Sequence, residues 1–233
     1  MMIGRPHLHY RSIGSTNTEA RRLAGAGAGS GTLVTSDGQT GGRGRQGRPW
    51  TSPAGALAYS VVLRRSVEVP STLPLQVGVA VCEAVESFGV ERAEVKWPND
   101  VWIDGRKVAG ILVEARPQDG WAVIGIGLNV VVAPEDFPAD VRERAASVEH
   151  GATIPRAIAA LNESLGRRVD SPVDETLSEF SARDALLGRR VGWEDGTGTA
   201  AGIDREGNLL VESPVGCLSS LNAGEVHLDV APD

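Results

Sequence analysis

The stretch KWPNDVWIDGRKVAGILVE, residues 96–114, decides the fold. Asp104-Gly105 separates two runs of apolar and β-branched residues, which is a strong signal for a β-hairpin. We predict one strand over residues 101–103 and a second over residues 107–114. The hairpin therefore makes the centre of the chain part of a β-sheet.

The same stretch holds the two lysines of the chain, Lys96 and Lys107, among 23 basic residues. An ammonium is a compact point charge and a guanidinium is a broad planar fork, so we infer that arginine cannot serve at these two positions. Because side chains alternate along strands, the hairpin can direct both lysines and Asp100 into one pocket. A carboxylate beside phosphates suggests Mg²⁺, which takes one or two protein carboxylates. The alternatives are a chance composition and a surface hairpin with an Asp–Lys ion pair.

The hairpin is flanked by further elements of both kinds. Strands are predicted over residues 32–36, 56–63, 93–97 and 121–132. Helices are predicted from a Ser15 cap to Ala24, and over residues 75–88, 141–148, 155–165 and 173–186. We therefore expect an α+β domain in which helices pack on a mixed sheet.

The pattern of apolar residues and turn signals changes after Gly188. Short apolar runs then alternate with turn signals such as Asp195-Gly196 and Ser213-Pro214. This pattern is typical of a small β-barrel. We accordingly predict two domains, residues 1–187 and residues 188–233.

Composition excludes several classes of protein. The 233 residues include 23 Lys+Arg and 30 Asp+Glu, which gives a net charge of −7, and 41% are hydrophobic. These values are typical of a globular protein and argue against a general nucleic-acid binder. Cys82 and Cys217 are too few for a disulfide scaffold or a zinc cluster. No apolar run reaches the ~18 residues of a membrane span, and no signal peptide is visible. We expect a cytoplasmic protein with no membrane partner.

Residues 38–53 form a loop rich in glycine and arginine. Gly42, Gly44 and Gly47 match the dinucleotide pattern G-x-G-x-x-G, but prolines follow where that pattern needs a helix. Glycines let the backbone approach a ligand, and arginine forks bind carboxylate or phosphate. We expect the loop to wrap an anionic ligand and to become ordered on binding it. The alternatives are a solvated surface loop and an RNA contact.

A third motif, GIGLN at residues 125–129, places glycines in a predicted buried strand. Glycine in a strand often lets a ligand approach closely. Close packing of two backbones is the alternative.

Four motifs together resemble one family: STN at residues 15–17, QTGGRGRQGRPW at 39–50, the hairpin stretch, and GIGLN. In order and spacing they are similar to bacterial biotin protein ligases, the biotin–[acetyl-CoA-carboxylase] ligases. The resemblance covers Ser15 to about Val132. It implies a catalytic domain like that of class II aminoacyl-tRNA synthetases and an SH3-like C-terminal domain. Two departures, Gly38 and Gly41, stand where bulkier residues are expected, and neither removes a proposed ligand.

The resemblance implies roles for individual residues. Biotin is expected to be bound by Ser15, Thr16, Asn17, Gln39, Gly42, Arg43, Gly44, Arg45, Lys107 and Gly125. ATP is expected to be bound by Arg45, Arg48, Trp50, Lys96, Asn99, Asp100, Lys107 and Asn129. Of these, Trp50 is expected to pack against adenine. Lys107, Arg45 and Asp100 are expected to be catalytic, with Asp100 also on the Mg²⁺.

The resemblance also implies partners. Biotin and ATP are the expected substrates, and the acceptor is a lysine of a biotin carboxyl carrier domain. Only 14 residues precede Ser15, too few for the helix-turn-helix domain of the family's repressors, so DNA binding is not expected. We expect a monomer or a weak homodimer. The alternatives are a lipoate–protein ligase and a non-catalytic nucleotide- or RNA-binding module.

Overall fold

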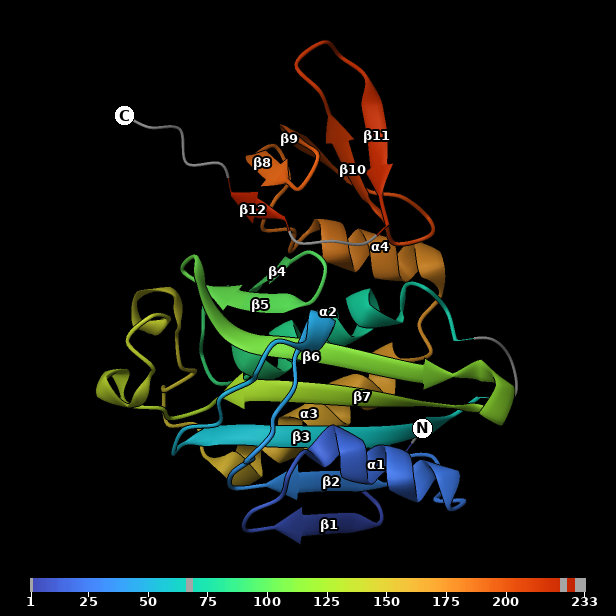
Figure 1. The fold of residues 1–233 in the computed structure, drawn as a ribbon, viewed down its shortest axis with the longest axis vertical. Coiled ribbons are helices and arrows are strands. Elements are labelled where there is room, and N and C mark those ends of the chain that lie inside the picture. Colours follow the sequence, from blue (N-terminus) through green and yellow to red (C-terminus); the bar gives the residue numbers. More distant parts are fainter. Residues whose placement is uncertain (1, 66–68, 223–225, 229–233) are drawn as a thin grey trace.

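The computed structural model describes residues 2–65, 69–222 and 226–228. A seven-stranded sheet forms its centre, with the strand order β1-β2-β3-β7-β6-β5-β4 (Figure 1). The strands are β1 (His7–Tyr10), β2 (Leu33–Ser36), β3 (Ala56–Arg64), β4 (Glu94–Lys96), β5 (Asp100–Ile103), β6 (Arg106–Arg116) and β7 (Trp121–Asn129). Neighbouring strands are antiparallel except β1 and β2, which are parallel. The predicted mixed sheet and its central hairpin are confirmed.

Helices cover the two faces of the sheet unequally. Helix α1 (Thr16–Gly25) lies on one face, beside β2 and β3, while α2 (Leu73–Glu86) and α3 (Ile154–Arg168) lie on the other (Figure 1). Helix α2 is buried along most of its length because it lies between the sheet and α3. Helix α4 (Val173–Ser181) also contacts α2. The thinly covered face, which carries α1 alone, is the face on which a ligand can reach the strands.

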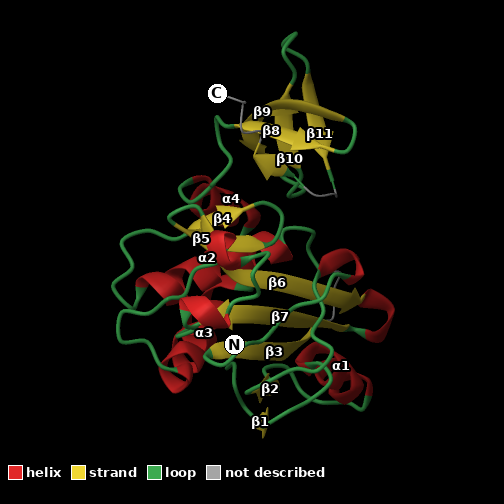
Figure 2. Ribbon diagram, turned by 60° about the vertical axis from the view of Figure 1, so that its left-hand side comes forward, coloured by secondary structure: helices red, strands yellow, loops and turns green. Residues whose placement is uncertain are grey.

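The C-terminal part is a second, antiparallel sheet that lies beyond α4 (Figure 2). Its strands are β8 (Arg190–Trp193), β9 (Gly196–Ile203), β10 (Leu209–Glu212), β11 (Leu218–Leu221) and β12 (His227–Leu228), in the order β11-β10-β9-β8-β12. This sheet agrees with the SH3-like expectation, but its ladder does not close into a barrel within the described residues. The buried side chains of Val191 and Leu209 belong to the same apolar core as α2. The boundary at residues 187/188 stays a prediction, because this core continues across it.

Residues 141–148 do not form the predicted helix. A 3₁₀ turn (Arg142–Arg144) precedes an extended segment, in which the Ala146 N–H donates to the Lys107 carbonyl at 2.8 Å and the Val148 N–H to the Asn129 carbonyl at 2.9 Å. Burial there alternates with a period of two, because Ala146 and Val148 are buried and Ser147 is less so. Backbone pairing with one end of β6 and of β7 therefore overrides the weak helical spacing.

Three smaller differences concern strand and helix ends. Strand β1 was not predicted, since four residues with two histidines carry little strand signal. Helix α4 ends at Ser181 rather than continuing to residue 186, because Asp184 instead forms a parallel bridge with Val95 of β4. Strand β7 ends at Asn129, before the predicted residue 132. Across the described segments, no helix combines the length and the apolar character that a membrane crossing requires.

Candidate active site

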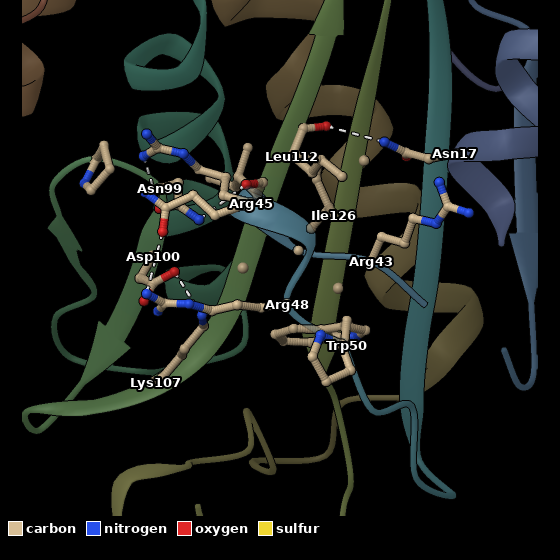
Figure 3. A pocket seen from close by; sticks show the side chains of 18 of the residues that line it. Asn17, Arg43, Arg45, Arg48, Trp50, Asn99, Asp100, Lys107, Leu112 and Ile126 are labelled. Carbon is tan, nitrogen blue, oxygen red and sulfur yellow. Dashed lines mark hydrogen bonds and ion pairs between the residues drawn. The ribbon is translucent and has the colours of Figure 1, made fainter. Parts of the chain in front are cut away.

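A pocket opens on the α1 face of the sheet, between the glycine- and arginine-rich loop and strands β6 and β7 (Figure 3). Most of the predicted site residues line it: Ser15, Thr16, Asn17, Gln39, Arg43, Gly44, Arg45, Arg48, Trp50, Lys96, Asn99, Asp100, Lys107 and Gly125. Residues from four separate sequence motifs therefore meet in one cavity.

Two predicted residues do not line the pocket. The buried Asn129 amide donates from Nδ2 to the Ala146 carbonyl at 3.0 Å, so it holds the extended segment against β7. Gly42 lies under the backbone of the loop, where an added Cβ would lie 2.4 Å from the Trp50 carbonyl oxygen. Gly42 therefore lies against Trp50, which lines the pocket, and Asn129 holds a segment outside it.

Other lining residues were not predicted: Gln46, Pro49, Tyr59, Ser60, Trp97, Pro98, Gly110, Ile111, Leu112, Ile126, Gly127 and Val226. The sequence contained a signal for Ser60, because it is a polar residue within the apolar run of β3; in the structure its hydroxyl is fully buried. Gly127 belongs to the GIGLN motif itself. Val226 gave no signal, because its position near the pocket depends on how the C-terminal part folds back.

The N-terminus of α1 forms one wall of the pocket. Ser15 has extended backbone angles and caps the helix, since its hydroxyl accepts from the Thr18 N–H at 3.5 Å. The next residue, Thr16, donates from its backbone N–H to Gln39 Oε1 at 2.8 Å, and its hydroxyl lies 3.1 Å from the same oxygen. Gln39 Nε2 in turn donates to Ser52 at 3.2 Å. These bonds join the loop to the helix start and fix the Gln39 amide.

Ser60 and Asn17 extend this network across the sheet. The Ser60 hydroxyl lies 2.8 Å from Thr16 Oγ1 and 2.6 Å from Asn17 Oδ1. The Asn17 amide lies directly over Gly125, where an added Cβ would be only 2.1 Å from Asn17 Oδ1. The glycine of β7 is therefore required by the side chain above it, which is neither of the two interpretations expected for this motif, and direct approach of a ligand to the glycine stays a prediction.

A second pair of glycines accommodates Trp50. Gly110 of β6 and Gly127 of β7 are directly paired across the sheet. An added Cβ at Gly127 would lie 2.2 Å from the Trp50 ring, and one at Gly110 would lie 2.9 Å from it. The indole therefore lies against a floor without side chains, with Lys107 Nζ 5.4 Å from the ring centroid.

The loop turns back on itself above this floor. The Gly44 N–H donates to the Arg48 carbonyl at 2.8 Å, and the Trp50 N–H donates to the Gly42 carbonyl at 2.9 Å. Arg45 and Arg48 lie on the same side of the pocket as Lys107 in the close view, and Arg43 lies across Trp50 from them (Figure 3). Ordering of the loop by a ligand stays a prediction.

Cationic groups surround one carboxylate on the other side of the pocket. Lys107 Nζ lies 2.7 Å from Asp100 Oδ1, and Arg45 donates to Asn99 Oδ1 at 3.3 Å. Burial lowers the pKa of Lys96, an effect that Asp100 opposes and Lys107 reinforces.

Arg45 shows the same balance. Burial lowers the pKa of its guanidinium, Asp100 opposes this, and Arg48 adds to it. Arg45, Lys96 and Lys107 thus share Asp100 as a neighbouring anion, and Arg48 adds a further positive charge near Arg45 and Lys96. The Asp–Lys ion pair lies inside the pocket and not on an outer surface, and such an excess of positive charge is suited to a phosphate-bearing ligand.

The C-terminal sheet reaches the same site. The indole N–H of Trp97 donates to the carbonyl of Gly207, in the turn between β9 and β10, at 3.0 Å. Val226 of the C-terminal part lines the pocket. The C-terminal part therefore contacts the cationic side of the pocket directly.

Comparison with known proteins agrees with this geometry. Residues 10–130 match the biotin/lipoate A/B protein ligase family, and residues 186–229 match the biotin protein ligase C-terminal domain. The biotin–[acetyl-CoA-carboxylase] ligase of Mycobacterium tuberculosis is 35% identical, over 85% of this chain and 80% of the relative. The bifunctional ligase/repressor BirA of Bacillus subtilis is 34% identical, over 95% of this chain and 74% of the relative.

Solved structures extend the similarity to the fold. The Aquifex aeolicus biotin protein ligase in complex with biotin and ATP superposes with a TM-score of 0.79 at 27% identity, covering 96% of this chain and 98% of the other. The Leishmania major biotin protein ligase in complex with biotinyl-5-AMP gives a TM-score of 0.66 at 25% identity, covering 94% and 99%.

Proposed function

This chain belongs to the biotin/lipoate A/B protein ligase family, and we propose that it is an ATP-dependent biotin–protein ligase whose two half-reactions take place in the pocket described above. The observation that carries the proposal is the division of the pocket into a side lined by hydrogen-bonded neutral groups around Asn17, with Arg43 at its edge, and a cationic side around Asp100. A neutral ureido ring suits the first side, and a triphosphate suits the second. The carboxylate of biotin would then lie where the two sides meet.

In the first half-reaction, a biotin carboxylate oxygen attacks the α-phosphorus of ATP, and the bond to the bridging oxygen breaks as pyrophosphate leaves. Lys107 and Arg45 hold the reacting oxygens together and offset the charge that grows on the α-phosphate. Arg48 and Lys96 bind the remaining phosphates. Positioning and electrostatics supply the catalysis, and no covalent enzyme intermediate is needed.

In the second half-reaction, the neutral ε-amine of a lysine on a biotin carboxyl carrier domain attacks the carbonyl carbon of biotinyl-5′-AMP. The C–O bond to AMP breaks, an amide forms, and the amine loses a proton. Asp100 is a candidate acceptor for that proton. The loop that carries Arg43 and Trp50 covers the mixed anhydride and excludes water.

Magnesium fits this site only as a partner of the phosphates. Asp100 supplies a carboxylate, and no cluster of three potential metal-ligating side chains occurs among the residues that the structure describes. Mg²⁺ characteristically takes one or two protein carboxylates and completes its shell with phosphate oxygens and water. When bound, the ion would neutralise phosphate charge, with Asp100 as its protein ligand.

The remaining expectations complete the proposal. The enzyme acts in the cytoplasm as a monomer or weak homodimer, and it binds neither DNA nor membranes. The acidic overall charge, 23 Lys+Arg against 30 Asp+Glu, supports the absence of DNA binding, which favours a basic surface. A lipoate–protein ligase is disfavoured, because the curated relatives and solved neighbours described above are biotin enzymes.

Mass spectrometry of a carrier domain tests the proposal. The carrier domain is incubated with this protein, ATP, Mg²⁺ and either biotin or lipoate. We expect a biotinyl mass shift on one lysine and none with lipoate. A lipoyl mass shift would favour a lipoate–protein ligase. No shift and no vitamin-dependent pyrophosphate exchange, together with salt-sensitive RNA binding, would favour the non-catalytic module.

A further inference from the structure

A carboxylate lies behind the neutral side of the pocket without lining it. Glu114, on β6, accepts from Asn17 Nδ2 through Oε2 at 2.9 Å. Its other oxygen, Oε1, accepts from Arg21 of α1 at 2.8 Å. Arg21 therefore fixes the position of a carboxylate whose second oxygen faces a pocket residue.

This arrangement allows one orientation of the Asn17 amide. Glu114 Oε2 and the Leu112 carbonyl, 3.4 Å away, both lie beside the same end of the amide. Neither group has a proton to donate when the carboxylate is ionised. The NH₂ group must face them, and Oδ1 must face Ser60, because the reverse orientation would place an amide oxygen against two acceptors.

The orientation of Asn17 sets the hydroxyl of Ser60. Asn17 Oδ1 cannot donate, so at 2.6 Å the Ser60 hydroxyl proton points to it. Ser60 Oγ then has lone pairs left toward Thr16 Oγ1, 2.8 Å away. Its single proton is used within the protein, so Ser60 can offer the pocket only an acceptor.

At Thr16 and Gln39, the other end of the network, the donors and acceptors are fixed in the same way. The Thr16 backbone N–H is a donor, so the oxygen of Gln39 must face it. The Thr16 hydroxyl proton can go to Gln39 or to Ser60, both of which are acceptors at 3.1 and 2.8 Å. The hydroxyls of Thr16 and Ser60 therefore both keep lone pairs for a ligand.

We propose that Glu114 is a positioning residue that fixes the Asn17 amide and so makes the pocket floor accept the N–H groups of a neutral cyclic urea. This inference rests on the proposed function, since the urea is the ring of biotin. Glu114 acts through Asn17, and the glycine at position 125 leaves room for the amide in this orientation. The role makes Glu114 a determinant of biotin recognition and leaves the phosphate side independent of it.

A double-mutant cycle of Glu114→Ala and Asn17→Ala tests the proposal by biotin-dependent ATP–pyrophosphate exchange. We expect Glu114→Ala to raise the biotin KM about tenfold and to leave kcat and the ATP KM within about twofold. The double variant should be no worse than Asn17→Ala alone, because coupled residues give non-additive effects. Glu114→Gln, which keeps the size and a hydrogen-bonding end, should lose less than Glu114→Ala.

Two controls separate this role from a structural one. Arg21→Ala removes the ion pair but leaves the carboxylate, so it should raise the biotin KM less than Glu114→Ala. Glu19→Gln removes a comparable charge on the same face of the fold, where Glu19 pairs with Arg22 away from the pocket, and should have no effect. Melting temperatures identify variants that are merely unfolded, and Glu114→Gln then carries the test.

Two results would overturn the assignment. Additive losses in the cycle would mean that Glu114 does not act through Asn17. An unchanged biotin KM in folded Glu114→Ala, with an active wild type, would remove the role altogether. A wild type without any biotin-dependent exchange would instead overturn the proposed function, and the role of Glu114 with it.

Discussion

The two sides of the pocket differ in how far the protein satisfies its own polar groups. On the neutral side, a hydrogen-bond network spans α1, β3 and the loop. Ser60 bonds directly to Asn17, Asn17 bonds to Glu114, and Gln39 accepts from the Thr16 backbone. On the cationic side, Arg45, Lys96 and Lys107 neighbour Asp100, and Arg48 adds a fourth positive charge. One side is complete before a ligand arrives, and the other carries an excess of positive charge.

This difference indicates that the two sides of the pocket recognise different parts of the substrates. The neutral side is built on the start of α1 and on two central strands, so it can select a ring by fixed hydrogen-bond directions. The cationic side is built from the loop and from strands β4, β5 and β6, and burying its like charges has an electrostatic cost that a polyanion relieves. Substitutions on the neutral side should therefore change mainly the biotin KM, and those on the cationic side mainly the ATP KM.

The largest effect is expected at Lys107. Lys107→Ala should reduce biotin-dependent pyrophosphate exchange by about 10²–10³-fold, the usual range when one preorganised group that stabilises transition-state charge is lost. Lys107→Arg should be nearly as impaired, because a planar fork cannot take the place of an ammonium 2.7 Å from Asp100. The neighbouring Arg106, exposed at the hairpin turn, gives the matched control, and Arg106→Ala should stay active. Near-normal exchange by folded Lys107→Ala would remove it from the catalytic group.

Gly127→Ala should have the next largest effect, because its Cβ would lie 2.2 Å from the indole of Trp50. Because Trp50 is expected to pack against adenine, displacing its ring should raise the ATP KM by at least about tenfold, the loss expected when recognition geometry shifts by an ångström. Gly192→Ala is the control, since its Cβ would meet nothing closer than 3.7 Å. Equal ATP KM values for both variants would show that the position of Trp50 does not matter for nucleotide binding.

Sequence patterns predicted the site better than they predicted its supports. The hairpin at Asp104-Gly105 and the Ser15 cap were readable because each depends on local residue chemistry. The extended segment at residues 145–148 was not, because its backbone pairs with β6 and β7, which are distant in sequence. The partnership of Glu114 with Asn17 was hidden for the same reason: their 97-position separation leaves no local pattern.

A smaller effect should appear as a pH dependence at Lys96. Burial lowers the pKa of its ammonium, and Lys107 and Arg48 lower it further against the opposing effect of Asp100. As pH rises, Lys96 therefore loses its charge before an ordinary lysine at about 10.4 does, and its attraction for ATP is lost with the charge. The ATP KM should therefore rise several-fold at a pH below that at which an ordinary lysine titrates, while the biotin KM stays flatter. Lys96→Arg keeps its charge, so an identical ATP profile in that variant would contradict the assignment.

The smallest effect is expected where the C-terminal sheet meets the cationic side. Trp97→Phe keeps a buried aromatic ring but removes the N–H that donates to Gly207 at 3.0 Å. Losing one such bond and leaving a carbonyl unsatisfied should cost about 1–2 kcal/mol of unfolding free energy, measured by denaturant titration. Because Trp97 directly follows Lys96, the ATP KM should also rise, by about two- to threefold, with the biotin KM unchanged. Trp121→Phe, at the far end of β7 and outside the pocket, should leave the ATP KM unchanged. If the biotin constant rose in Trp97→Phe instead, the C-terminal contact would act on the neutral side, and the two sides would not be independent.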